Sequence, residues 1–278
     1  MFTPSRRLSL VLAAVAFAAI AFAAVASASH SWGNYHWART SNPFTVKLGD
    51  NVSSAWDSYL STAASDWNSS TVLNTTVVAG GTGGARRCPA TTGRVEVCAD
   101  KYGQNGWLGL ASIQISGSHI TAGTVKMNDT YYNMAQYNTP AWRRMVMCQE
   151  IGHTFGLDHQ DENFSNYNLG TCMDYTNDPD GGGSFGPSNV APNSHDYEQL
   201  NTIYSHTDST TTVGQSVNKG APPAQNDIEA EGPGQWGKVV GRYSDGVPKV
   251  YELDFGNGHK TFTFVFWTPD THRKMQEH

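Results

Sequence analysis

The sequence predicts an α+β protein with one large domain built around a β-sheet, few helices and a small C-terminal β module. Strand-like segments separated by glycine-rich breaks fill residues 44–127, and only three stretches have the spacing of amphipathic helices. A polar segment without apolar periodicity, residues 207–235, precedes the last short apolar stretches. We therefore expect a domain over residues 29–206, a linker over 207–235 and a module over 236–278.

One helix among five strands is expected in the first half of the chain. Residues 44–48 alternate apolar and polar side chains, which is typical of a half-buried strand. Between Val52 and Trp67 apolar residues recur at steps of three and four, as on one face of a helix. The further strand candidates are residues 72–78, 94–99, 108–115 and 120–127.

Two more helices are expected in the second half. Thr139 can cap a helix and Pro140 suits its first position, so this helix should run from Pro140 to about Phe155. Gly156 follows, where a left-handed residue would end the helix. Apolar spacing predicts another helix around residues 197–204.

The C-terminal module is expected to be a small antiparallel meander. Asp-Gly at residues 245–246 and Asn-Gly at 257–258 are strong turn signals between its apolar runs. Its aromatic residues could form an exposed binding surface, but we expect them to fill a small core. These residues are Trp236, Tyr251, Phe262, Phe264 and Trp267.

The N-terminus has the organisation of a secretory signal peptide over residues 1–28. Arg6 and Arg7 precede an apolar stretch that ends in Ala-Ser-Ala, a small-residue cleavage pattern. An uncleaved membrane anchor is the alternative, but the many alanines and the small-residue ending favour cleavage before Ser29. We expect a secreted, extracellular protein without membrane contact after cleavage.

Charge and cysteine content narrow the partners and the compartment. The formal net charge of −6 becomes −8 when the two arginines of the signal peptide are removed, so no basic field exists to bind nucleic acid. An even number of cysteines in an exported chain predicts disulfides, and three pairings are formally possible. The cysteines are Cys88, Cys98, Cys148 and Cys172, and a bond between the first two would close a short loop.

The residues with recognisable chemistry are concentrated in the segment CQEIGHTFGLDH, residues 148–159. It resembles the metzincin signature HExxHxxGxxH of zinc endopeptidases, with Gln149 in place of the first histidine. The matching positions are Glu150, His153, Gly156 and His159. Residues 149 and 153 share one face of a helix, and a sharp turn at Gly156 lets His159 approach from another direction.

The resemblance implies a zinc ion held by Gln149, His153 and His159, with a fourth position open for water. In metzincins the glutamate beside the first ligand takes a proton from zinc-bound water, which assigns Glu150 as general base. The implied reaction is hydrolysis of peptide bonds in a protein or peptide substrate. We expect the protein to act as a monomer.

A second match is TCMDY, residues 171–175, which resembles the Met-turn beneath the metal in metzincins. Met173 would form the floor of the site, and Tyr175 stands where astacin-like and serralysin-like members have a tyrosine near zinc or the oxyanion. Matrixins, which residues 153–159 otherwise resemble more closely, usually have proline there. Because a metzincin packs its Met-turn against its active-site helix, the resemblance also implies that Cys148 lies near Cys172.

The resemblance further implies a metzincin-like catalytic domain with a twisted, mostly parallel sheet. Residues 106–115 would be the edge strand above the cleft, the strand that pairs with an extended substrate. Ser29 and Asn42 are separated by only 42 − 29 = 13 positions, so we expect no folded pro-domain before the catalytic strands.

Gln149 leaves three readings of the site open. The chain could be a working peptidase that uses the amide oxygen of Gln149, although this neutral donor suits zinc less than imidazole does. A water molecule or another histidine could replace Gln149 as a ligand. The candidate histidines, which no motif singles out, are His119, His195 and His206. The third reading is a catalytically inactive secreted binding protein. The presence of both Glu150 and Tyr175 favours activity.

Calcium is a weaker prediction that rests on two acidic groups. One is Asp174, Asp178 and Asp180, beside the glycines at 181–183, and the other is Asp158, Asp161 and Glu162. Oxygen donors in such loops can bind calcium, but neither group has the regular spacing of a known calcium loop.

Overall fold

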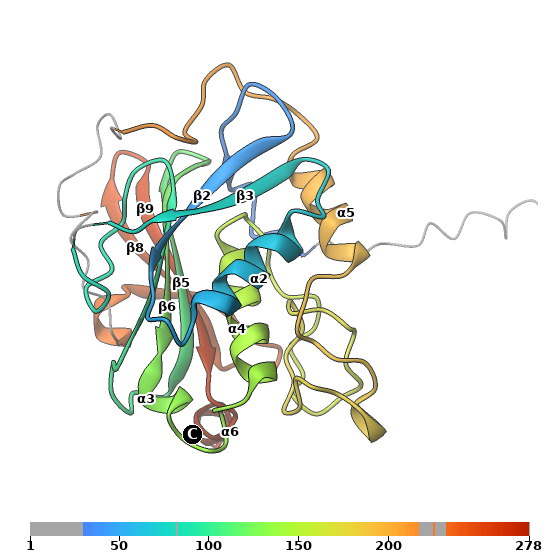
Figure 1. Ribbon diagram of the computed structural model, residues 1–278. Coiled ribbons are helices and arrows are strands. Elements are labelled where there is room, and N and C mark those ends of the chain that lie inside the picture. Colours follow the sequence, from blue (N-terminus) through green and yellow to red (C-terminus); the bar gives the residue numbers. More distant parts are fainter. Residues whose placement is uncertain (1–29, 82, 217–224, 226–231, 278) are drawn as a thin grey trace, which may run out of the picture.

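The structure is a computed structural model that describes residues 30–81, 83–216, 225 and 232–277 (Figure 1). The expected signal peptide, residues 1–28, lies outside the described residues, as do 217–224 and 226–231 of the expected linker. No helix in the described ranges has the length and apolar character that crossing a membrane requires.

A single mixed sheet runs through the described chain in the order β3-β2-β4-β6-β5-β9-β8-β7, and β1 also pairs with β6. Strands β1, β2, β3, β4 and β6 pair in parallel, whereas β5 runs antiparallel to β6. The strands are β1 (His36–Trp37), β2 (Phe44–Asn51), β3 (Leu73–Ala79), β4 (Val95–Asp100), β5 (Trp107–Ser116), β6 (His119–Asn128), β7 (Lys238–Arg242), β8 (Pro248–Gly256) and β9 (His259–Trp267). Strands β1–β6 therefore confirm the mostly parallel sheet.

Few helices accompany the sheet, as predicted. The described α-helices are α2 (Asp57–Trp67), α3 (Asp129–Tyr132), α4 (Pro140–His153), α5 (Ser194–Ile203) and α6 (Pro269–Gln276). Figure 1 shows α2 and α4 beside one another against the sheet. Sequence reasoning missed α6, because this polar helix has no apolar stripe and buries only His272.

Helix α4 begins where its sequence indicates and ends slightly before the expected Phe155. The side chain of Thr139 accepts a hydrogen bond from the backbone amide of Trp142, and Pro140 opens the helix. The helix ends at His153, and Gly156 adopts a φ of +95°. A Cβ at Gly156 would lie 2.4 Å from the carbonyl oxygen of Tyr35, so only glycine fits this turn.

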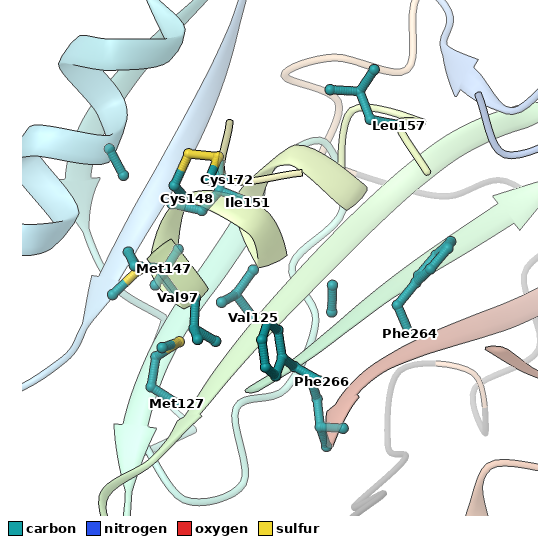
Figure 2. Packing of buried hydrophobic residues seen from close by; sticks show 14 of the residues in the cluster. Val97, Val125, Met127, Met147, Cys148, Ile151, Leu157, Cys172, Phe264 and Phe266 are labelled. Atoms are coloured by element: carbon teal, nitrogen blue, oxygen red, sulfur yellow. A yellow bond between two sulfur atoms is a disulfide. The ribbon is translucent and has the colours of Figure 1, made fainter. Parts of the chain in front are cut away.

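The core between α4 and the sheet includes residues from both ends of the sequence. Figure 2 shows Val97 and Val125 of the sheet facing Met147 and Ile151 of α4. Phe264 and Phe266 of β9 belong to the same buried cluster. The C-terminal strand is therefore part of the main core.

Strands β7, β8 and β9 form the antiparallel meander that the turn signals predicted. Asn257 and Gly258 both have positive φ, 54° and 80°, as a tight hairpin turn requires. The prediction that residues 106–115 form an edge strand is wrong, because β9 pairs with β5 from Trp107 to Ser116. The reason is that β9 carries large apolar side chains that become buried beside β5.

The aromatic residues of the C-terminal segment are buried, as predicted, but they do not make a core of their own. Phe264 and Trp267 are each 1% exposed and join the cluster that includes α4. Within the expected linker, the amide of Thr212 bonds to the carbonyl of Ala38, so this part packs on the large domain. The division into domain, linker and module stays a prediction about folding units.

Candidate active site

The residues of the predicted site are buried in helix α4 and the segment after it. Gln149 is 0% exposed, Glu150 and His153 are 1% exposed, and His159, in the segment after the helix, is 8% exposed. The structure brings the two histidines together, with 3.0 Å between their Nε2 atoms. The sequence motif thus becomes a compact cluster beneath the surface.

The oxygen partners of the two histidines favour the tautomer with the proton on Nδ1. His153 Nδ1 lies 2.9 Å from the carbonyl oxygen of Leu157, and His159 Nδ1 lies 3.3 Å from Glu162 Oε1. A proton on each Nδ1 satisfies these oxygens and places a lone pair on each Nε2. Two lone pairs 3.0 Å apart repel each other unless they share a cation. This is the arrangement that an imidazole pair adopts around a metal.

The charge state of His153 agrees with this reading. Burial lowers the pKa of His153 well below its usual value, and the neighbouring His159 lowers it further. The ring is therefore neutral at physiological pH. A neutral imidazole is the form that binds a metal.

The side-chain amide of Gln149 is buried without hydrogen bonds to the described residues. Neither Oε1 nor Nε2 has a hydrogen-bond partner among the described residues, although the side chain is fully buried. A buried amide without partners destabilises the fold by about 1–3 kcal/mol. The oxygen is thus available as a metal ligand, which fits a metal site but supplies a weaker zinc donor than histidine.

Glu150 points toward strand β5. A Cβ added at Gly109 would lie 2.7 Å from Glu150 Oε1, so the missing side chain at Gly109 makes room for the carboxyl group. Neither carboxyl oxygen has a partner in the described part of the chain, and burial raises the pKa of Glu150 well above its usual value. In this conformation Glu150 is a neutral acid rather than a base.

The segment that resembles a Met-turn packs beneath α4. A Cβ at Gly152 would lie 2.7 Å from Met173 Sδ, so the helix and the turn touch at the one residue without a side chain. A disulfide joins Cys148 of the helix to Cys172 of the turn (Figure 2), and a second joins Cys88 to Cys98. The floor of the site is thus fastened to the helix.

Tyr175 lies beside the histidines, but its hydroxyl is occupied. Its ring centroid is 4.5 Å from that of His159. The hydroxyl donates to the carbonyl of Val265 over 3.4 Å and accepts a 2.6 Å hydrogen bond from Tyr243. Both partners belong to the C-terminal segment.

Sequence reasoning missed the residues that cover the site. Phe264 of β9 stacks on His153, with 4.6 Å between the ring centroids and an angle of 9° between the planes. The ring of Tyr243 lies parallel to that of His159 within 16°. The alternation of threonine and phenylalanine in β9 indicates a strand with one buried face, but it does not say which surface the strand covers.

An ion-pair group holds the cover in place. Lys249 Nζ of β8 lies 3.0 Å from Asp158 Oδ1 and 2.5 Å from Glu162 Oε1. Burial raises the pKa of Glu162, but hydrogen bonds from His159 and Lys249 and the charge of Lys249 outweigh it and lower the pKa to about 2. Because Lys249 already supplies the cation here, calcium has no structural support at this group.

The other proposed calcium group has no support either. Asp174 is buried, and its Oδ2 accepts hydrogen bonds from the amide of Leu169 and from Asn189 Nδ2. Burial raises the pKa of Asp174 to about 6, which weakens it as a cation ligand.

The candidate substitutes for Gln149 are engaged elsewhere in the described chain. His119 and His206 both approach Asp208 and lie against His36. The ring of His195 packs against that of His30, with 4.7 Å between centroids. Gln149 is therefore the residue left at the position of the first ligand.

Comparisons with known proteins give only distant structural similarity. No model of a protein family matches the chain, and no curated protein matches it. Among solved structures, myroilysin shows 13% identity and a TM-score of 0.36, covering 64% of this chain and 99% of its own. A hatching enzyme zinc-protease of Oryzias latipes (medaka fish), high choriolytic enzyme 1, shows 11% identity and a TM-score of 0.35, covering 61% and 94%. Family and activity are therefore argued from the residues alone.

Proposed function

We propose that this chain is a secreted metzincin-like zinc endopeptidase whose own C-terminal strand covers the active site. The observation that carries the proposal is the pair of Nε2 atoms of His153 and His159, 3.0 Å apart and oriented by partners on Nδ1. The buried, unpartnered groups of Gln149 and Glu150 on the same helix as His153 support it, because a core without such a function would gain stability from apolar residues there.

Each residue has a role that its position supports. His153 and His159 would hold zinc, with the amide oxygen of Gln149 as third donor. Bound zinc supplies Lewis-acid polarisation of an oxygen atom. Glu150 would accept a proton from the attacking water and return it to the leaving amine. Tyr175 would donate a hydrogen bond to the developing oxyanion once its hydroxyl is released.

The cover explains how such a site could be latent. Strand β9 runs antiparallel to β5, in the place where a metzincin-like edge strand would pair with an extended substrate. A substrate could bind only after β9 moves away from β5. The same movement would admit water to Glu150, remove the desolvation that keeps it neutral and restore a carboxylate that can act as base.

Metal analysis tests the proposed function directly. Purified mature protein, stripped with a chelator and returned to zinc, is expected to bind zinc at a site that the variant His153→Ala lacks. The zinc-loaded protein should cleave casein, and the stripped protein should not. If zinc uptake does not depend on His153 and casein stays intact, the enzyme proposal is wrong, and the inactive secreted binding protein becomes the favoured reading.

Truncation of the stacking ring tests the cover. Phe264→Ala is expected to weaken packing of the C-terminal strands by about 3–5 kcal/mol, because it removes a buried phenylalanine. The population with β9 detached from β5 should rise, so peptide cleavage per folded molecule should increase by up to about 10²- to 10³-fold. Rates would be measured below the melting temperature with zinc present.

Phe262→Ala is a second test on the same strand, where the buried ring packs against Trp32 and Tyr35, and it should also raise the rate because it loosens β9. Equal rates for wild type and both variants, in a protein that does cleave, would show that β9 does not limit substrate access.

A further inference from the structure

A second cluster of metal-ligating side chains lies outside the active site. It consists of His36, His119 and Asp208, whose ligand atoms all lie within 4.8 Å of one another, and of His206, which approaches His36 and Asp208. Strand β1 pairs with β6 in a register that puts His36 opposite His119, and the segment after α5 brings His206 and Asp208 to the same place. Three separate parts of the chain thus contribute to the cluster.

Four of the six separations within the cluster are close to those of a tetrahedral site. Asp208 Oδ1 lies 3.4 Å from His36 Nε2, 3.3 Å from His119 Nε2 and 3.8 Å from His206 Nε2. The Nε2 atoms of His36 and His206 are 3.2 Å apart. Ligands at 2.0–2.2 Å from zinc in a tetrahedron are separated by about 3.3–3.6 Å, so these four separations are near those of a shell. His119 and His206, the two more exposed side chains, would have to turn toward each other to complete it.

The surrounding hydrogen bonds prepare the ligand atoms. His36 Nδ1 donates to the carbonyl oxygen of Asn34 over 2.7 Å, which leaves the lone pair on Nε2. Arg39 binds the other oxygen of Asp208, with 3.0 Å between Nη1 and Oδ2, and so directs Oδ1 toward the histidines. Hydrogen-bond partners of this kind orient the side chains that bind the metal directly. Arg39 also donates to the backbone carbonyl of His206.

The cluster is also open to an incoming ion. The side chain of His36 is 9% exposed and that of Asp208 is 12% exposed, whereas His119 and His206 are 34% and 50% exposed. A cavity of about 240 Å³ borders His36 and His206. Two ligands are thus fixed inside, and two can close on the ion from the solvent side.

We propose that His36, His119, His206 and Asp208 form a second, structural binding site for a zinc-class divalent ion. Three imidazoles and one carboxylate are a donor set that zinc accepts in closed tetrahedral sites. A bound ion would join β1, the start of β6 and the segment that leaves α5, and so would fix the chain where it departs toward the C-terminal strands.

Zinc titration of the mature protein and of His119→Ala/His206→Ala tests this site, because both side chains are partly exposed and their loss should leave the fold intact. Wild type is expected to bind one more zinc ion than the double variant. Each single variant should weaken binding at this site at least about 100-fold. Cobalt substitution should give an absorption band of a tetrahedral ion that the double variant lacks.

His195→Ala is the matched control, a partly exposed histidine of α5 outside the cluster. Wild type and the double variant share the same active site. The difference of one bound zinc ion between them therefore does not depend on whether His153 and His159 bind zinc. Equal zinc uptake and equal cobalt spectra in wild type and double variant would overturn the proposal, leaving a cluster that shares protons instead of a metal.

Discussion

Glu150→Gln is expected to lower kcat for peptide hydrolysis about 10²- to 10⁴-fold while zinc binding is unchanged. Glutamine has the shape of glutamate but cannot accept a proton, which is the role proposed for Glu150. The side chain has no hydrogen-bond partner among the described residues and packs at Gly109, so the substitution should fit without rearrangement. Zinc content and peptide cleavage would be measured on the same sample.

The same variant should be more stable than wild type at neutral pH. Burial raises the pKa of Glu150 well above its unfolded value, so its contribution to stability is present below pH 4.5 and is lost as pH rises toward the folded pKa. Glutamine does not titrate. Denaturant unfolding of chelator-treated protein at pH 4 and pH 7 should therefore show a gain for Glu150→Gln only at the higher pH.

Glu198→Gln, on the exposed face of α5, is the control for a general effect of charge. Two outcomes would contradict the proposed role. One is a variant that retains full activity, and the other is a loss of activity that follows a loss of zinc.

Gln149→His is expected to tighten zinc binding by at least about 100-fold. Replacing the neutral amide oxygen with an imidazole nitrogen completes the three-histidine set that suits zinc. Mutation of a residue that only hydrogen-bonds to a metal ligand typically weakens metal binding about 10- to 100-fold. Gain of a ligand itself should change zinc affinity by at least as much. Position 149 is fully buried, and its amide makes no hydrogen bond in the described chain that histidine would break.

Gln149→Ala serves as the matched comparison, because it removes the oxygen donor without adding a nitrogen. If Gln149 is a ligand, zinc affinity should rise in the order alanine, glutamine, histidine. Equal affinity for alanine and glutamine would show that Gln149 does not touch the metal. If only the histidine variant cleaves peptide, the natural chain is the inactive relative.

Local sequence signals predicted most elements of the large domain. Helix α4 follows from Thr139, Pro140 and apolar spacing, because caps and periodicity are encoded within a few residues of one another. The tight meander of β7–β9 follows from two turn dipeptides. Strand β1 and helices α3 and α6 were missed, since a strand of two residues, a helix of four residues and a polar helix carry almost no periodic signal.

The candidate site could be predicted only in part. The spacing of Glu150, His153 and His159 is a local property, and the structure brings both histidines together. The partners that orient the histidines, Leu157 and Glu162, lie close in sequence but carry no motif. The cluster of His36, His119, His206 and Asp208 could not be predicted at all, because its members are separated by up to 172 positions and meet only through strand pairing.

The sequence by itself determined the chemistry that this protein can offer: a glutamine, a glutamate and one imidazole on one helix, and a second imidazole that follows a glycine turn. Only the tertiary structure decided whether that chemistry is accessible. Phe264 and Tyr243 are ordinary aromatic residues in the sequence, yet they lie on His153 and His159 because β9 pairs with β5. Pairing between distant strands depends on which apolar faces can be buried together, and that is a property of the whole chain.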